Sequence, residues 1–163
     1  MVERQLWRAR PSLPLAQAEA IMDGALKAAR GHDTEPMAVA VLDTGGHLIV
    51  FKREDGSGIL RAQIAVGKAW GALGMGASSR LLRDRLSARQ GFVAALTDVS
   101  EGRFVPVPGG VLVLDEKHYI LGAVGISGDT SERDELCAIH GIRAAGLVSQ
   151  PSEPDPDWQA SKL

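Results

Sequence analysis

The stretch FVPVPGGVLVLD, residues 104–115, places two prolines and two adjacent glycines directly before an apolar run that is typical of a buried strand. Proline cannot donate a hydrogen bond to a sheet, and Gly109 and Gly110 bring no side chain to pack. Pro106 and Pro108 would hold the entering segment outside the sheet. Two interpretations are open: main chain exposed to a ligand in a cleft, or a tight strand entry with nothing bound.

The segments around this strand predict one α/β domain. They are a helix over 15–31, strands over 37–43 and 47–53, a helix over 60–75, further helix over 78–99 with a break near 90–91, strands over 111–114 and 119–127, and a helix over 131–147. Ser131 and Asp134 resemble a capping box at the start of the last helix. The order helix, hairpin, helices, hairpin, helix predicts a largely antiparallel sheet with helices on at least one face.

Two flanking segments differ from this domain in composition. Residues 1–14 are charged and predict an extended arm, and residues 149–163 form a tail rich in Pro and Asp without periodicity. Such a tail buries too little apolar surface to order itself alone. Because Trp is enriched at interfaces, Trp158 in the tail is predicted to anchor on a neighbouring subunit. The domain proper is predicted to span residues 15–148.

Composition narrows the class of protein. The chain has 163 residues, 45% of them hydrophobic and 23% charged, which is ordinary for a single soluble domain. A net charge of −2 gives no broad attraction to nucleic acid or to an anionic membrane. No stretch resembles a signal peptide or a membrane span. A single cysteine, Cys137, excludes an intrachain disulfide and fits a reducing compartment, so a cytoplasmic location is expected.

Searches for familiar catalytic and metal motifs give little. The four histidines are far apart in the sequence and form no metal-binding pattern. The glycines of residues 71–76 follow no strand, so no nucleotide cofactor is expected. Cys137 lies in the last predicted helix, where a small buried apolar residue is favoured over a nucleophile.

Three polar groups remain as candidates. Asp43 and Arg53 stand at the two ends of the first predicted hairpin, where a turn former and an exposed ion pair are the simpler interpretations. Lys68 interrupts a small, apolar helical surface and faces either solvent or a carboxylate. Ser127 and Gly128 end a strand directly before the predicted helix start at Thr130, where free N–H groups attract anions.

The sequence also brings the two glycine-rich stretches together. Gly109 and Gly110 enter one strand of the second hairpin, and Ser127 and Gly128 leave its partner at the same end. This convergence predicts a cavity lined by main chain beside a helix N-terminus. It further predicts that Gly110→Val impairs ligand binding more than folding.

Four motifs in this order and spacing resemble the GlcG/HbpS-like family, which includes the C-terminal domain of PduO-type proteins. They are VAVLDTGGHLIVFKREDG (39–56), IAVGKAW (64–70), VPGGVLVL (107–114) and GAVGISGDTSERDE (122–135). The resemblance runs from about residue 15 to residue 147. It implies an α/β fold, with a five-stranded, mainly antiparallel sheet flanked by helices, and assembly into homo-oligomers from dimers to octamers.

The resemblance also implies that the protein binds haem or a related tetrapyrrole. The glycine loop with Val105 and Val107 would then form an apolar wall, and Arg53 or Lys68 would meet the propionates. The first predicted helix has no histidine before residue 32, although one haem-binding relative supplies an axial ligand from its first helix. The remaining candidate axial ligands are Met75, His118, Tyr119 and Thr130.

Two alternatives stay open beside haem binding. The protein could be a catabolic enzyme or accessory protein acting on a small organic acid, in which Lys68 holds a carboxylate and Glu132 or Asp134 moves a proton. It could also be a purely structural or regulatory oligomer, and the sequence leaves open whether it is an enzyme at all. The predicted ligand-binding residues are Asp43, Arg53, Lys68, Pro108, Gly109, Gly110, Ser127, Gly128 and Thr130, with Lys68, Glu132 and Asp134 as predicted catalytic residues.

Overall fold

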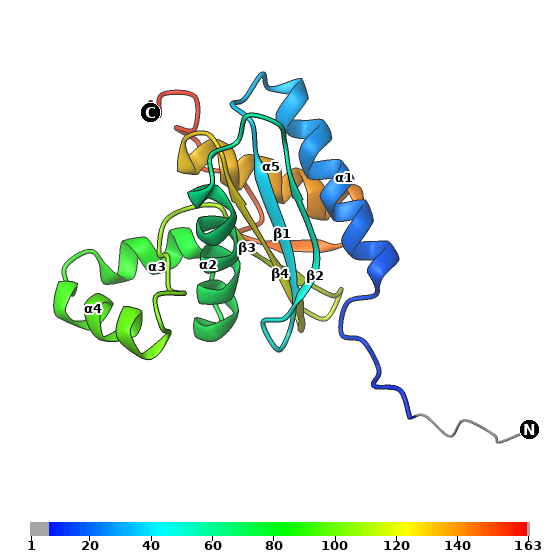
Figure 1. The fold of residues 1–163 in the computed structure, drawn as a ribbon, viewed down its shortest axis with the longest axis horizontal. Helices are drawn as coiled ribbons and strands as arrows, with labels where there is room; N and C mark the ends of the chain where they lie inside the picture. Colours follow the sequence, from blue (N-terminus) through cyan, green and yellow to red (C-terminus); the bar gives the residue numbers. More distant parts are fainter. Residues whose placement is uncertain (1–6, 163) are drawn as a thin grey trace, which may run out of the picture.

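The computed structural model describes residues 7–162, which form a single five-stranded sheet with helices on both faces (Figure 1). The elements are α1 (Leu15–Gly31), β1 (Ala38–Asp43), β2 (Leu48–Arg53), α2 (Leu60–Met75), α3 (Ser79–Leu86), α4 (Gln90–Val99), β3 (Gly110–Leu114), β4 (Ile120–Ser127), α5 (Ser131–Ala144) and β5 (Val148–Gln150). The strand order is β2-β1-β4-β3-β5, and all neighbours are antiparallel. The predicted fold class is confirmed.

In the described part of the chain, only one face of the sheet carries a cluster of Gly and Ala residues beneath a helix. Side chains alternate between faces along a strand, and the valines and isoleucine of β1, β3 and β4 pack against α1 and α5. The opposite face, which α2 covers, carries the leucines Leu42, Leu112 and Leu114 and a set of small residues, namely Ala38, Ala40, Gly110, Ala123 and Gly125. Figure 1 shows α3 and α4 extending from the α2 side, away from α1. The small residues therefore determine which helix can lie closest to the strands.

Helix α2 rests directly on the main chain of the sheet. A Cβ added at Gly110 would lie 2.2 Å from the carbonyl oxygen of Lys68, and one at Gly125 would lie 1.8 Å from that of Ala65. The close neighbour that these glycines accommodate is thus the protein's own helix. The expectation for Gly110→Val is revised accordingly, because the valine would collide with α2 and impair folding itself.

Predicted and observed element boundaries agree closely. The break near residues 90–91 separates α3 from α4, and the last helix ends at Ala144 rather than at residue 147. The residue patterns missed strand β5, whose three residues pair with β3. It begins at the predicted boundary between domain and tail. No helix among residues 7–162 has the length and apolarity that crossing a bilayer requires.

The capping box predicted at Ser131 and Asp134 is wrong by one residue. Thr130 is the N-cap of α5, and its hydroxyl oxygen accepts a hydrogen bond from the N–H of Arg133 at 3.4 Å. Asp134 instead reaches back to the N–H of Asp129. The carboxylate of Asp134 is therefore directed into the protein and away from the helix surface.

Both terminal segments make contacts within the chain. Residues 1–6 of the predicted arm lie outside the described part, Trp7 is exposed, and Leu13 is buried in the core. The tail folds back, so that the ring centre of Trp158 lies 5.2 Å from that of His32. Trp158 thus packs on His32 of its own chain, whereas the sequence predicted an anchor on a neighbouring subunit.

The seating of α2 on the sheet predicts a large effect of a single methyl group. Gly125→Ala should lower the free energy of unfolding by at least about 2 kcal/mol, because its Cβ has no space beside Ala65. The control is Gly91→Ala in α4, where nothing lies within 4 Å of the new Cβ; it should stabilise by up to about 1 kcal/mol. Urea unfolding measures both, and equal effects would contradict this packing.

Candidate functional site

A buried ion pair lies where the predicted site residues converge. The Nζ of Lys68, from α2, lies 2.8 Å from the Oδ2 of Asp134, in the first turn of α5. The two side chains are only 2% and 1% exposed. The other carboxylate oxygen of Asp134 accepts a hydrogen bond from the N–H of Asp129 at 3.1 Å. Of the two predicted environments for Lys68, the structure shows the one with a carboxylate of the protein.

Gly109 covers this pair with bare main chain. Its φ of +114° favours glycine, and an added Cβ would lie 2.9 Å from the Nζ of Lys68 and 3.0 Å from the Cβ of Asp134. The carbonyl of Gly109 accepts a hydrogen bond from the N–H of Ile126. The two glycine-rich stretches therefore do meet, as predicted, but the space between them is filled by Lys68 and Asp134.

Ser79 fixes the strand entry next to these glycines, and sequence reasoning missed it. The N–H of Gly110 donates to the Oγ of Ser79 at 2.7 Å, and this hydroxyl lies 3.2 Å from the carbonyl oxygen of Gly110. Ser79 is buried at the start of α3. Nothing in the sequence around Ser79 points to its contact with a strand that begins 31 residues later.

The interior raises the proton affinity of Asp134. Burial raises the pKa of this carboxyl to about 6, and the neighbouring charge of Lys68 opposes the rise. The charge of Lys68 therefore offsets part of the cost of burying the Asp134 carboxylate. Neither side chain lines the pockets described below, so the pair lies behind the protein surface.

A polar pocket of about 390 Å³ lies outside this pair, at the N-terminus of α5. Its walls are Arg61, Arg83, Val107, Pro108, Asp129, Thr130, Ser131, Glu132, Ser161 and Lys162. Three predicted residues, Pro108, Thr130 and Glu132, thus share one cavity. The two arginines come from α2 and α3, and sequence reasoning missed them because nothing local places those helices near α5.

Carboxylates of the protein already occupy the anion-friendly positions before α5. The N–H of Thr130 donates to Asp129 at 2.7 Å, and the N–H of Asp129 donates to Asp134. Burial of Asp129 would raise its pKa, but main-chain donors from Glu35 and Thr130 hold it below the usual value. The Nη1 of Arg83 lies 3.1 Å from Glu132. The positive charge of this pocket is therefore largely balanced from within.

Three predicted ligand-binding residues take other positions. Asp43 ends β1 opposite Gly122, at the far end of the sheet, and its Oδ1 accepts the N–H groups of Gly45 and His47. Arg53 lines a separate depression on the surface together with Arg30, Pro36, Glu54 and Asp55. Gly128 packs on Met37, whose sulfur would lie 2.4 Å from an added Cβ. None of these three residues lines the polar pocket at the N-terminus of α5.

An apolar groove of about 410 Å³ opens on the other side of α2. It is lined by Leu48, Phe51, Ala62, Gln63, Val66, Glu101, Gly102 and Arg103, from β2, α2 and the loop before β3. The guanidinium of Arg103 lies 4.5 Å from the ring centre of Trp70, and its Nε donates to the carbonyl of Ser100. Because three distant segments form the groove, no single motif could predict it.

The residues predicted to surround haem are dispersed. Val105 packs on Gly67 of α2, and Val107 lines the polar pocket. Met75 lines a smaller apolar pocket of about 170 Å³ beside Trp70, whereas His118 and Tyr119 lie between β3 and β4. None of the predicted axial ligands lines the apolar groove. No three His, Cys, Asp or Glu side chains of the described chain form a metal-binding group.

The buried pair predicts an asymmetric response to mutation. Lys68→Met should destabilise the protein by about 3–5 kcal/mol, because it leaves the carboxylate of Asp134 buried without its cation. Lys68→Met with Asp134→Asn should recover at least half of that loss. The matched control is Lys52→Met, which removes an exposed pair with Asp23 and should cost at most about 1 kcal/mol. Chemical unfolding measures these free energies. A double variant whose loss equals the sum of the two single losses would contradict coupling between Lys68 and Asp134.

Comparisons with known proteins place this arrangement among relatives. The chain is 29% identical over 104 residues to an uncharacterized 15.0 kDa protein of the dhaT–dhaS intergenic region of Citrobacter freundii, covering 63% of this chain and 71% of that one. The fold is similar to that of the PduOC–haem complex, with a TM-score of 0.74, 24% identity, and 83% and 96% of the two chains covered. It is also similar to ORFY of Klebsiella pneumoniae, with a TM-score of 0.74, 23% identity, and coverage of 90% and 98%.

A crystal structure of HbpS gives a TM-score of 0.70 at 25% identity and covers 88% of this chain and 96% of HbpS. The sequence model of the family described as "Haem degrading protein HbpS-like" matches residues 13–143, well over half of the chain. This stretch includes Lys68, Asp134 and every strand except β5. The chain therefore belongs to the HbpS-like family.

Proposed function

We propose that the protein binds haem or a related tetrapyrrole, and that the apolar groove between β2 and α2 is the binding surface. The chain belongs to a family whose description names haem, and this supports the class of ligand. The observation that supports the place is the lining of the groove, in which Leu48, Phe51 and Val66 present apolar surface to the outside. A tetrapyrrole is a flat apolar disc with acidic substituents, and apolar walls with few polar groups suit such ligands.

Arg103 is the cation best placed to meet a propionate in this groove. Its planar guanidinium can bind a carboxylate with two parallel hydrogen bonds. The ring of Trp70 and the carbonyl of Ser100 hold it in place. Glu101 lies 3.8 Å from Arg103 but is exposed, so it competes only weakly. Lys68, by contrast, is committed to Asp134 inside the protein.

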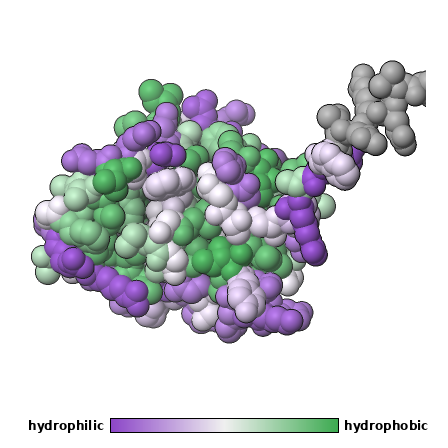
Figure 2. Space-filling model, turned by 90° about the horizontal axis from the view of Figure 1, so that it is seen from below, coloured by the Kyte–Doolittle hydropathy of each residue, from purple (hydrophilic) through white to green (hydrophobic). Residues whose placement is uncertain are grey.

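The groove is open on its outer side, and we propose that a second copy of the chain closes it in a homo-oligomer. Helix α4 has the sequence QGFVAALTDV, yet none of its residues is buried. Phe92 is 38% and Val99 79% exposed. The end of the molecule that α4 forms is largely apolar in Figure 2. Exposed apolar surface of this kind marks association sites. We also propose a cytoplasmic location, which fits a chain with a single cysteine.

A second candidate is the binding of a small organic acid in the polar pocket at α5. The observation that favours it is the pair of guanidinium groups, Arg61 and Arg83, in a cavity of about 390 Å³. Of the predicted catalytic residues only Glu132 lines this pocket, so a proton transfer there would fall to Glu132. The charge balance within the pocket makes it the weaker candidate.

Haem titration distinguishes the two surfaces. Val66→Glu should weaken haem binding at least tenfold, because it places a charge on the apolar wall of the groove. Val107→Glu is the matched control, since it makes the same change in the polar pocket and should leave binding within about twofold. The Soret absorbance of the purified variants measures this. Loss of binding only in Val107→Glu, or no Soret shift in the parent protein, would overturn the proposal.

The oligomer is tested separately by light scattering during gel filtration. Val99→Asp should reduce the molar mass or raise the dissociation constant at least tenfold, because it charges the exposed face of α4. Ile59→Asp is the control, as Ile59 is 80% exposed at the start of α2. A parent protein that runs as a monomer of about 17 kDa would contradict the proposed assembly.

A further inference from the structure

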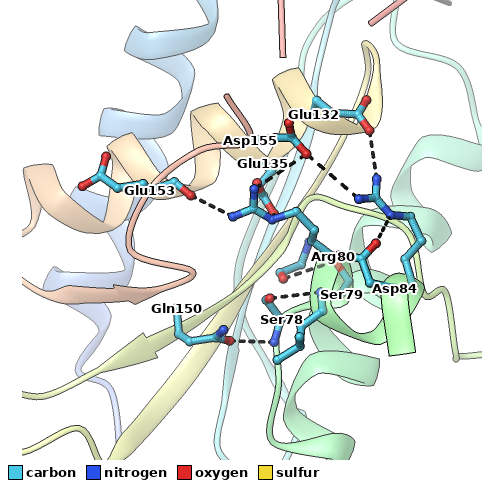
Figure 3. A network of polar contacts seen from close by, with 12 residues as sticks. Ser78, Ser79, Arg80, Asp84, Glu132, Glu135, Gln150, Glu153 and Asp155 are labelled. Carbon is cyan, nitrogen blue, oxygen red and sulfur yellow. Dashed lines mark hydrogen bonds and ion pairs between the residues drawn. The ribbon is translucent and has the colours of Figure 1, made fainter. Parts of the chain in front are cut away.

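The C-terminal strap, defined here as residues 150–162, lies across α3 and α5 (Figure 3). The side chain of Gln150 accepts a hydrogen bond from the N–H of Ser78 at 2.7 Å. The carbonyl of Glu153 accepts one from Arg80 at 2.8 Å. Ser161 donates to Glu132 at 2.6 Å. The strap is therefore held by polar side chains along its length, and it lies entirely beyond the residues that the family model matches.

A buried carboxylate lies beneath this strap. Glu135 of α5 has 0% exposure, and the Nε of Arg80 lies 3.2 Å from its Oε2. The main-chain N–H of Asp155, in the strap, lies against this carboxylate, but none of the described groups makes a well-aligned hydrogen bond to either oxygen of Glu135. Asp155 of the strap lies 3.7 Å from the Nη1 of the same Arg80. Arg80 is thus shared between the buried carboxylate and the strap.

Acidic groups outnumber basic groups around this contact. Two guanidinium groups, Arg80 and Arg83, face four carboxyl groups, those of Asp84, Glu132, Glu135 and Asp155. When Glu135 is ionised, it competes with Asp155 for Arg80, and the two carboxylates repel each other. When Glu135 is protonated, Arg80 is free for Asp155 and the strap. The geometry therefore links docking of the strap to a proton on Glu135.

We propose that the C-terminal strap is a proton-sensitive cover of the polar pocket, docked most tightly when Glu135 carries a proton and loosened when Glu135 ionises. Ser161 and Lys162 form part of the wall of that pocket. Release of the strap opens the pocket and exposes Glu135 to water. This inference is independent of what the pocket or the apolar groove binds.

The direction of the pH effect follows from the burial of Glu135. Burial raises its pKa to about 7 from the ordinary value of 4.5; Arg80 and the main-chain N–H of Asp155 oppose the rise, and the carboxylate of Asp155 adds to it. A carboxyl with a raised pKa stabilises the docked state fully below about pH 4.5, and this stabilisation is lost as the pH rises through about 7. Each pKa unit of this shift that the strap causes weakens docking about tenfold over that range.

His140 acts in the opposite sense and needs a control. His32 packs on Trp158 of the strap, with ring centres 5.2 Å apart, and on His140 at 5.8 Å. Burial and the neighbouring His32 lower the pKa of His140. Neutral His140 therefore favours docking, and this contribution is lost as the pH falls below the ordinary histidine range. Comparison of variants at equal pH cancels this effect.

Hydrogen exchange of residues 151–162, followed by mass spectrometry between pH 5 and pH 8, tests the proposal. Protection in the parent protein, divided by protection in Glu135→Gln at the same pH, should fall at least about tenfold from pH 5 to pH 8. Glu153→Gln is the matched control, because its side chain pairs with Arg143 and lies outside the Glu135 contact. It should show the parent's pH dependence.

A second variant covers the case in which Glu135→Gln fails to fold. Asp155→Asn removes the carboxylate that competes with Glu135 for Arg80 and leaves the interior unchanged, so its protection should fall less from pH 5 to pH 8 than that of the parent protein. A ratio that stays constant from pH 5 to pH 8 would overturn the proposal. So would an Asp155→Asn strap whose protection falls as steeply from pH 5 to pH 8 as the parent's.

Discussion

The close contact between α2 and the main chain of the sheet is the constraint on which the other features depend. At Gly110 and Gly125 the helix carbonyls occupy the space in which side chains would otherwise lie. A helix this close to the strands can bring Lys68 through to Asp134 on α5, and Gly109 then closes over the pair. Buried ions need partners in close geometry, because water cannot reach them. The glycines thus allow α2 to pack closely on the sheet of the same chain.

The same contact gives α2 two different sides. Ala65, Ala69 and Ala72 face the sheet and are fully buried, whereas Ala62 and Val66 line the apolar groove. The buried side is tightly packed and its charged groups are paired, which suits stability more than ligand exchange. The open side has apolar walls and a cation at its rim. This division is why the proposed tetrapyrrole surface lies away from the glycine-rich motifs.

Much of the fold could be predicted from the sequence, because strands and helices differ in local period. The small-residue stripe of α2 and the two hairpins are local patterns, and the structure confirms them. The predicted convergence of Gly109 with Ser127 and Thr130 also follows from hairpin register. The occupant of that space could not be predicted, since Lys68 and Asp134 are 66 residues apart. Arg61, Arg83 and Ser79 were missed for the same reason, as was β5, whose polar sequence shows no strand period.

The most direct test of the account is methyl-resolved NMR of the protein titrated with ferric haem, whose paramagnetic iron broadens nearby signals. The account predicts that the methyl signals of Leu48 and Val66 broaden first, while those of Val107 and Ile126 stay sharp at equal occupancy. Broadening confined to Val107, or spread evenly over the core, would contradict a tetrapyrrole surface on the open side of α2.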